Sequence, residues 1–202
     1  MKNGKLIKVC GMTNSDNIRE AEAAGADLIG FIFYPKSPRK ILTPPSYRPK
    51  KAVGVFVDAA YDEIMVQQLR FGFEYVQLHG KENPSLCKEL KESGFTVIKA
   101  FSIAGKADLK KTAEYEGCCH FFLFDTKCSS VGGSGEQFDW SILKSYNGKT
   151  PFLLSGGLSL ESIDKLREFS HPKFTGYDLN SKFETQPGLK DINKLEEFIN
   201  KI

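Results

Sequence analysis

The sequence lacks any long apolar run and any marked excess of charge of one sign. No stretch approaches the roughly 18 consecutive apolar residues that a membrane helix needs, and Lys8 interrupts the first apolar run, which argues against a signal peptide. The 28 Lys and Arg residues nearly balance the 25 Asp and Glu residues, and no basic stripe or nucleic-acid-binding module is present. We therefore expect neither a membrane nor a nucleic acid as a partner.

Cysteine and histidine are too few and too scattered for a disulfide framework or a metal site. The five cysteines are an odd number without a C-x-x-C pair, which is typical of reduced thiols in a cytoplasmic protein. The three histidines lie apart from one another and from any cysteine pair at metal-ligand spacing. The sequence thus predicts a cytoplasmic protein that holds no metal.

What the sequence does contain is a series of short apolar runs, each bounded by Gly, Asp or Ser. Most are apolar at nearly every position, as is typical of parallel strands that are covered on both faces. The eight predicted strands are Leu6–Cys10, Leu28–Phe33, Ala52–Val57, Tyr75–Leu78, Thr96–Phe101, Phe121–Phe124, Phe152–Leu154 and Phe174–Leu179.

Helical patterns lie between most of these runs. Thr13 and Asp16 resemble a capping box, and Asn83-Pro84 places a cap residue before a proline at the first helical position. Residues 42–50 contain three prolines and cannot sustain a helix. The predicted helices are Asn14–Ala24, Tyr61–Arg70, one starting at Pro84, Ala107–Tyr115, Asp139–Lys144, one capped by Ser159 and one from Ile192 to Ile202.

Eight strands that alternate with seven helices and one irregular crossover predict an α/β fold, a single-domain (β/α)8 TIM barrel. The irregular, Pro-rich crossover at residues 42–50 is expected to replace its second helix. An open doubly wound sheet is the alternative. No linker or low-complexity stretch divides the chain, so residues 1–202 are expected to form one domain.

In such a barrel the site forms at the carboxyl ends of the strands and in the loops that follow. Ser155-Gly156-Gly157 follows the seventh strand, where two glycines allow a close approach to an anion and the next helix offers free N–H groups. Turn glycines without a ligand are the alternative. Residues 132–135, Gly-Gly-Ser-Gly, do not form a dinucleotide fingerprint, and indicate either a mobile loop over the site or an ordinary flexible loop.

Cys10 ends the first predicted strand, Asp125 directly follows the sixth, and the two are the candidate acid–base pair. Each is weak evidence alone, because a strand cysteine often serves as a small buried hydrophobe. At pH 7 an unperturbed aspartate is only about 0.1% protonated and an unperturbed cysteine about 3% thiolate. The pair therefore needs a site that favours a neutral Asp125 and a charged Cys10, or a small protonated fraction of Asp125 that reacts quickly.

Several motifs occur in order along almost the whole chain. They are Lys8–Thr13, Gly30–Arg39, Val76–Gly80, Phe124–Thr126, Gly132–Gly135, Ser155–Leu158, Asp178–Ser181 and Pro187-Gly188. Together they closely resemble the phosphoribosylanthranilate isomerase family of tryptophan biosynthesis. The agreement of so many motifs in register makes the resemblance specific.

The resemblance implies an isomerase that rearranges N-(5-phosphoribosyl)anthranilate, a small phosphoribosyl substrate, to 1-(o-carboxyphenylamino)-1-deoxyribulose 5-phosphate. It implies that Asp125 is the general acid that opens the ribose ring. Cys10 would be the general base that removes the proton from the adjacent sugar carbon. This Amadori chemistry implies no cofactor, and the protein is expected to be a monomer or a homodimer.

The resemblance also implies a set of substrate-binding residues. Arg39 would face the anthranilate carboxylate, which suits its planar, two-pronged donor group. Lys182 departs from the family pattern, which usually has glycine there, so its side chain either crowds the phosphate or adds to its binding. The implied binding residues are Arg39, His79, Gly133, Ser155, Gly156, Gly157, Asp178, Asn180 and Ser181.

Two other functions fit parts of the sequence. Lys99 could form a Schiff base in an aldolase-like barrel acting on a sugar phosphate, although a polar residue at a strand end is the plainer interpretation. A phosphoribosyl-binding barrel without catalysis, its pocket altered by Lys182, is the second. The intact pair of Cys10 and Asp125 argues against that second function.

Overall fold

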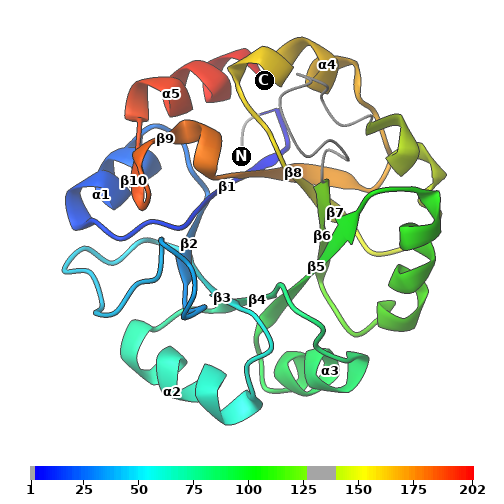
Figure 1. Ribbon diagram of the computed structural model, residues 1–202, viewed down its shortest axis with the longest axis horizontal. Helices are drawn as coiled ribbons and strands as arrows, with labels where there is room; N and C mark the ends of the chain where they lie inside the picture. The colour runs from blue at the N-terminus through cyan, green and yellow to red at the C-terminus, as the bar shows by residue number, and fades with distance from the viewer. Residues whose placement is uncertain (1–2, 127–139) are drawn as a thin grey trace.

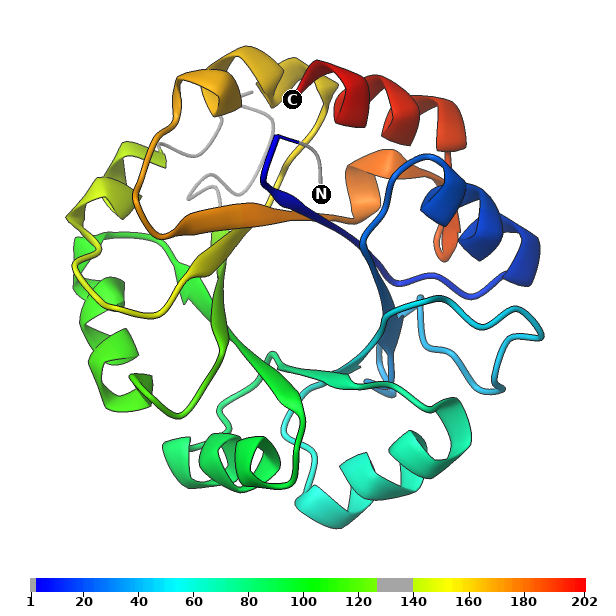
Figure 2. The same ribbon diagram turned by 180° about the vertical axis from the view of Figure 1, so that it is seen from behind.

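In the computed structural model, which describes residues 3–126 and 140–202, eight parallel strands close into a ring (Figures 1 and 2). Each strand pairs with the next along the chain, and β8 pairs with β1. An open sheet would leave two edge strands, so the doubly wound alternative is wrong. The strands are β1 Leu6–Cys10, β2 Leu28–Ile32, β3 Ala52–Phe56, β4 Tyr75–Leu78, β5 Thr96–Ile103, β6 Phe121–Thr126, β7 Phe152–Ser155 and β8 Phe174–Leu179.

Helices form the outer layer of the barrel (Figure 1). Those that follow β5 and β6 are 3-10 helices. In the described ranges no helix combines the length and apolar character needed to cross a bilayer. The helices are α1 Ser15–Ala23, α2 Tyr61–Phe71, α3 Pro84–Glu92, η1 Lys106–Tyr115, η2 Trp140–Ser145, η3 Leu160–Ser162, α4 Ile163–Glu168, η4 Ser181–Phe183 and α5 Ile192–Lys201.

Two of the helix starts test the predicted caps. The Asn83 side chain accepts a hydrogen bond from the Leu86 N–H at 2.9 Å, with Pro84 as the first helical residue, as predicted. At α1 the capping box predicted for Thr13 and Asp16 is wrong. Asn14 is the cap, because its side chain accepts from the backbone N–H at position 17 at 3.0 Å.

Two connections depart from a regular alternation of strand and helix. Residues 33–51, between β2 and β3, contain no helix, and a parallel bridge joins Lys40 to Ile32. Between β8 and α5 the chain forms η4 and then an antiparallel hairpin of β9 (Glu184–Gln186) and β10 (Leu189–Lys190), which the sequence analysis did not predict. Both connections start at carboxyl ends of strands.

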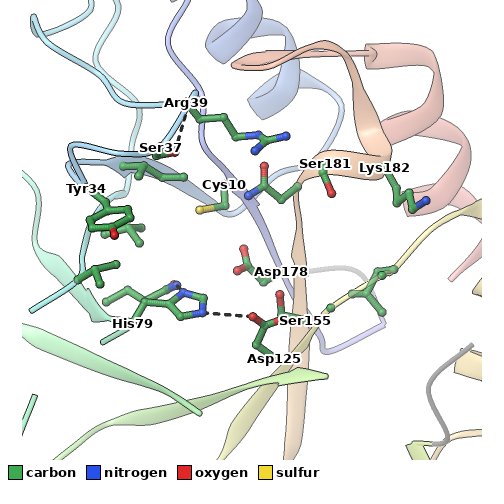
Figure 3. Close-up of a pocket in the computed structure, with 18 residues that line it drawn as sticks. Cys10, Tyr34, Ser37, Arg39, His79, Asp125, Ser155, Asp178, Ser181 and Lys182 are labelled. Carbon is green, nitrogen blue, oxygen red and sulfur yellow. Dashed lines mark hydrogen bonds and ion pairs between the residues drawn. The ribbon is translucent and has the colours of Figure 1, made fainter. Parts of the chain in front are cut away.

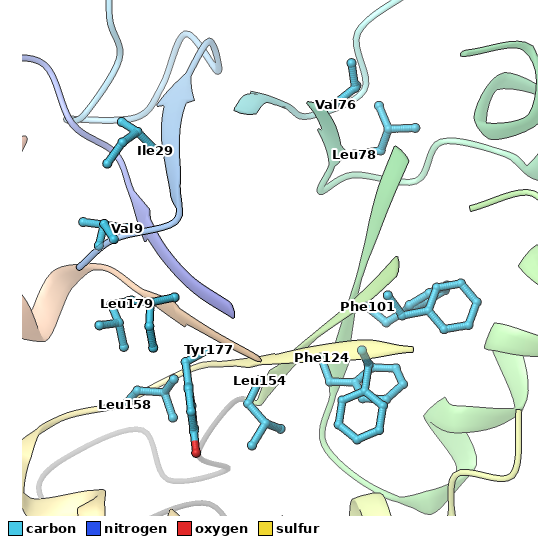
Figure 4. Close-up of a cluster of buried hydrophobic side chains, with 14 of the residues drawn as sticks. Val9, Ile29, Val76, Leu78, Phe101, Phe124, Leu154, Leu158, Tyr177 and Leu179 are labelled. Atoms are coloured by element: carbon cyan, nitrogen blue, oxygen red, sulfur yellow. The ribbon is translucent and has the colours of Figure 1, made fainter. Parts of the chain in front are cut away.

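The strands are buried on both faces, which explains their nearly continuous apolar sequences. On the outer face, side chains from strands and helices form a large cluster rich in aromatics (Figure 4); in it the Phe124 and Phe152 ring centroids lie 4.7 Å apart. A second cluster fills the inside of the ring, because successive side chains of a strand point to opposite faces. It consists of Cys10, Leu28, Val53, Val55, Ile98, Ala100 and Leu123.

Candidate active site

The carboxyl ends of the strands surround a pocket of about 430 Å³ (Figure 3). Gly133, one of the predicted site residues, lies outside the described residues together with the whole Gly-Gly-Ser-Gly run. Every other predicted residue lines this one pocket. These residues are Cys10, Arg39, His79, Asp125, Ser155, Gly156, Gly157, Asp178, Asn180 and Ser181.

The pocket also contains residues that the sequence analysis did not single out. Tyr34, Ser37 and Gln77 line its wall. Tyr34 and Ser37 belong to the motif that ends at Arg39, and Gln77 lies in β4, two residues before His79. Strand alternation would have found Gln77, because residues two apart share a face.

Cys10 is almost completely buried at the base of the pocket. Two residues earlier on β1, Lys8 pairs with Asp178 of β8 at 2.7 Å, and neither side chain is more than 5% exposed. Burial raises the pKa of the Cys10 thiol, and the Asp178 carboxylate raises this pKa further. The Lys8 and Lys190 ammonium groups lower it. Nearby positive charge, which favours the thiolate, is therefore present, but burial outweighs its effect on the pKa of the thiol.

Asp125, at the end of β6, lies across the pocket from Cys10 (Figure 3). Its Oδ2 is 3.3 Å from His79 Nε2, and His79 Nδ1 is 3.2 Å from Gln77 Nε2. A neutral imidazole that accepts from Gln77 and donates to Asp125 satisfies both contacts. The Asp125 side chain is 23% exposed and lines the pocket.

Arg39 extends from the β2–β3 crossover to the hairpin that follows β8. Its Nε donates to Glu184 Oε1 at 2.8 Å and its Nη2 to Oε2 at 2.6 Å. Lys190 Nζ bridges Glu184 Oε1 at 2.7 Å and Asn180 Oδ1 at 2.8 Å. Burial alone raises the pKa of Glu184, but the hydrogen bonds from Arg39 and Lys190 hold it below its ordinary value. The hairpin thus fixes the guanidinium in place.

Gly11, directly after Cys10, lets this network close over the end of β1. Its φ of 76° lies in the left-handed region that favours glycine. A Cβ at this position would lie 2.8 Å from Arg39 Cδ and 3.2 Å from Asn180 Oδ1. A larger residue here would displace two of the predicted binding side chains.

The loops after β7 and β8 form the opposite side of the pocket. Gly156 and Gly157 have φ values of 84° and 69°, and such backbone turns can aim successive N–H groups at an anion. Ser181 and Lys182 complete this side, and both are exposed. The described part of the chain contains no cluster of His, Cys, Asp and Glu side chains that could hold a metal ion.

Lys99 lies outside this pocket, which excludes the aldolase-like function. Its ammonium is 3.1 Å from Glu82 Oε2 and 2.9 Å from the Gly80 carbonyl oxygen, and the two charged side chains are 3% and 1% exposed. A Schiff-base lysine must reach the substrate. Lys99 instead holds the chain after β4 against β5.

A closed parallel barrel whose strand ends surround a pocket with a thiol, a carboxyl group and two glycines of left-handed backbone has the architecture of a TIM-barrel enzyme. A family model described as N-(5'phosphoribosyl)anthranilate (PRA) isomerase matches residues 7–201. The chain belongs to this family.

Individual relatives agree with the family model. The N-(5'-phosphoribosyl)anthranilate isomerase of Phocaeicola vulgatus is 50% identical over 199 residues, which cover 98% of this chain and 97% of the relative. The crystal structure of phosphoribosyl anthranilate isomerase from Thermotoga maritima has a TM-score of 0.84 at 33% identity and covers 98% of both chains. A related isomerase, crystallised with reduced 1-(o-carboxyphenylamino)-1-deoxyribulose 5-phosphate, has a TM-score of 0.82 at 31% identity over 98% of this chain and 97% of its own.

The chain is therefore an isomerase of tryptophan biosynthesis. It catalyses the Amadori rearrangement of N-(5-phosphoribosyl)anthranilate to 1-(o-carboxyphenylamino)-1-deoxyribulose 5-phosphate.

Proposed function

We propose that Asp125 and Cys10 carry out this rearrangement as general acid and general base. Asp125 gives its proton to the ribose ring oxygen while the bond from that oxygen to C1 breaks, and the nitrogen lone pair forms the iminium. The Cys10 thiolate then removes the proton from C2, and the enolamine tautomerises to the ketone. The observation that carries the proposal is that these two groups share one pocket with the loops after β7 and β8. Replacing either group should lower turnover by orders of magnitude but leave the binding of a product analogue largely intact.

The contact with His79 supports the role of Asp125. A neutral imidazole that donates to Oδ2 orients the carboxyl toward the pocket. Because its side chain is partly exposed in the pocket, Asp125 can reach the substrate, and it acts in its protonated form. After the ring opens, the same hydrogen bond stabilises the carboxylate that is left.

We propose that Arg39 binds the anthranilate carboxylate, and we expect Arg39→Ala to raise KM about tenfold to a hundredfold with a smaller effect on kcat. Glu184 occupies Nε and Nη2, and Nη1 has no acceptor in the described ranges. A hydrogen bond to a charged group contributes about 1.5–3 kcal/mol. Steady-state kinetics of the variant measure this loss.

Two controls separate this role from a general loss of structure. Arg39→Lys keeps the charge without the planar fork and should recover only part of the affinity. A product analogue with aniline in place of anthranilate has no carboxylate, so its affinity should be equal for wild type and Arg39→Ala. If Arg39→Ala lowers the affinity for both analogues by the same factor, Arg39 does not bind the carboxylate.

We propose that the loops containing Ser155, Gly156, Gly157 and Asn180-Ser181 bind the substrate phosphate and that Lys182 adds to this binding. Lys182 lines the pocket together with Gly157 and Ser181. Its side chain therefore lies near these loops. Lys182→Gly should raise the inhibition constant of inorganic phosphate by up to about fivefold at low salt. The effect is small because the lysine is exposed, and an exposed ion pair contributes little.

The matched control is Lys50→Gly, which removes the same charge from an exposed position outside the pocket and should leave phosphate inhibition unchanged. A Lys182→Gly variant that binds phosphate more tightly than wild type would mean that the lysine crowds the pocket.

Several properties of the whole chain belong to the same proposal. Residues 1–202 act as one cytoplasmic domain, and the Pro-rich segment 42–50 takes the place of the second barrel helix. The enzyme is a monomer or a homodimer; one related structure is of monomers generated from the dimeric isomerase of Thermotoga maritima. We also propose that catalysis needs no cofactor and no nucleic acid.

A further inference from the structure

Lys8 is a lysine inside the barrel whose side chain is fully buried. It stands opposite Asp178 in the register of β1 and β8, and its ammonium donates to Asp178 Oδ1 at 2.7 Å. Taking both charges out of water is costly, and an apolar pair of similar volume would often be at least as stable. The steps proposed for Asp125 and Cys10 make no use of this ion pair.

The geometry couples Lys8 to the catalytic thiol. Lys8 and Cys10 are two residues apart on β1, so both side chains point into the ring. The ammonium donates to Asp178, and Asp178 lines the same pocket as Cys10. Lys8, Asp178 and the thiol therefore lie together inside the ring.

The other charged groups around Cys10 are already paired. Arg39 from the crossover and Lys190 from β10 share the Glu184 carboxylate. Asp125 and His79, across the pocket, contact each other. Among the described charged residues around the thiol, Lys8 is thus the cation on the same strand and the same face as Cys10, and its partner Asp178 of β8 is the anion that competes with the thiolate.

We propose that Lys8 is a positioning residue that stabilises the Cys10 thiolate by moving its hydrogen bond from Asp178 toward the sulfur when the thiol ionises. This inference rests on the proposed role of Cys10 as the base. In the resting enzyme the thiol is neutral and the ammonium is paired with Asp178. The thiol gives its proton to water in the pocket. The Lys8 ammonium then interacts with two anions, the Cys10 thiolate and the Asp178 carboxylate.

The electrostatics of the three groups have the signs that this mechanism needs. Burial lowers the pKa of Lys8, but the Asp178 carboxylate and then Cys10 raise it above its ordinary value, so the ammonium stays charged. After burial, Lys8 has the largest effect on the pKa of the Cys10 thiol and lowers it, whereas Asp178 raises it. The two members of the ion pair therefore act on the thiol in opposite directions.

This opposition gives a test that does not depend on isomerase activity. The rate at which iodoacetamide alkylates Cys10 is measured against pH, with the modified peptide quantified by mass spectrometry. Lys8→Met should slow alkylation at pH 7 about tenfold or more, since an adjacent opposite charge shifts a pKa by one unit or more. Asp178→Asn should speed it, because the thiolate becomes the sole anionic partner of Lys8.

Two further variants sharpen the result. Lys8→Met leaves the Asp178 carboxyl buried without a partner, so it takes up a proton, and the double variant Lys8→Met/Asp178→Asn should alkylate at the rate of Lys8→Met alone. Lys99→Met removes a buried lysine of similar exposure from its pair with Glu82, away from the pocket. It should leave Cys10 alkylation unchanged, which controls for a general loosening of the barrel.

Equal alkylation in folded Lys8→Met and wild type would overturn the inference, as would equal or slower alkylation in Asp178→Asn. If Lys8→Met does not fold, the Asp178→Asn result decides alone. Where Lys8→Met folds, its kcat/KM should also rise toward the wild-type value at alkaline pH. Failure of the proposed function has a different signature, which is turnover that persists in Cys10→Ala.

Discussion

Cys10→Ala is expected to lower kcat by about a thousandfold or more and to leave the affinity for a reduced product analogue within about threefold of wild type. A positioned general base contributes about 10²- to 10⁴-fold, and alanine offers no group that can accept the C2 proton. The thiol is buried at the base of the pocket, so its loss removes few contacts with substrate. The loss of substrate fluorescence measures kcat, and calorimetry measures binding.

The matched control is Cys87→Ala. Cys87 is as buried as Cys10 but lies on α3, outside the pocket. It should retain wild-type turnover even if its thermal stability falls. A folded Cys10→Ala enzyme within tenfold of wild-type kcat would remove the assignment of Cys10 as the base.

Asp125→Asn should cause a loss of similar size, about a hundredfold to ten-thousandfold in kcat. The amide has the shape of the carboxyl and can still contact His79, but it has no acidic proton for the ribose ring oxygen. Ring opening then becomes limiting. The measurement is kcat and KM by the same fluorescence assay, with KM expected to change little because the acid acts on the reacting atoms.

Asp58→Asn is the control for Asp125→Asn. Asp58 follows β3 and lies outside the pocket, where its carboxylate accepts a hydrogen bond from the Lys81 backbone N–H. The same change of charge there should leave kcat within twofold of wild type. An Asp125→Asn enzyme that loses affinity but keeps kcat would mean that Asp125 binds substrate and does not protonate it.

Much of the fold follows from local sequence. The apolar runs Leu6–Cys10, Tyr75–Leu78 and Phe174–Leu179 coincide with β1, β4 and β8, because strands covered on both faces are apolar at nearly every position. The site followed from the same reasoning, since reactive residues at strand ends, such as Cys10 and Asp125, must meet at one end of a closed barrel.

The remainder depends on contacts between distant parts of the chain. Lys8 and Asp178 are 170 residues apart, and their pairing becomes visible only when β8 closes the barrel on β1. The hairpin that holds Arg39 through Glu184 has no alternating apolar signal in its two short strands. The raised pKa of the Cys10 thiol is a property of packing around the side chain, which composition and spacing do not encode.

The most direct test of the acid–base account is the single-turnover rate of fluorescence loss in wild type, in both single variants and in the double variant Cys10→Ala/Asp125→Asn. The two groups act in one proton-transfer sequence, so their effects should not add. The account predicts a double variant about as slow as the slower single variant, with the product analogue still bound. A folded double variant that turns over substrate within tenfold of wild type would contradict it.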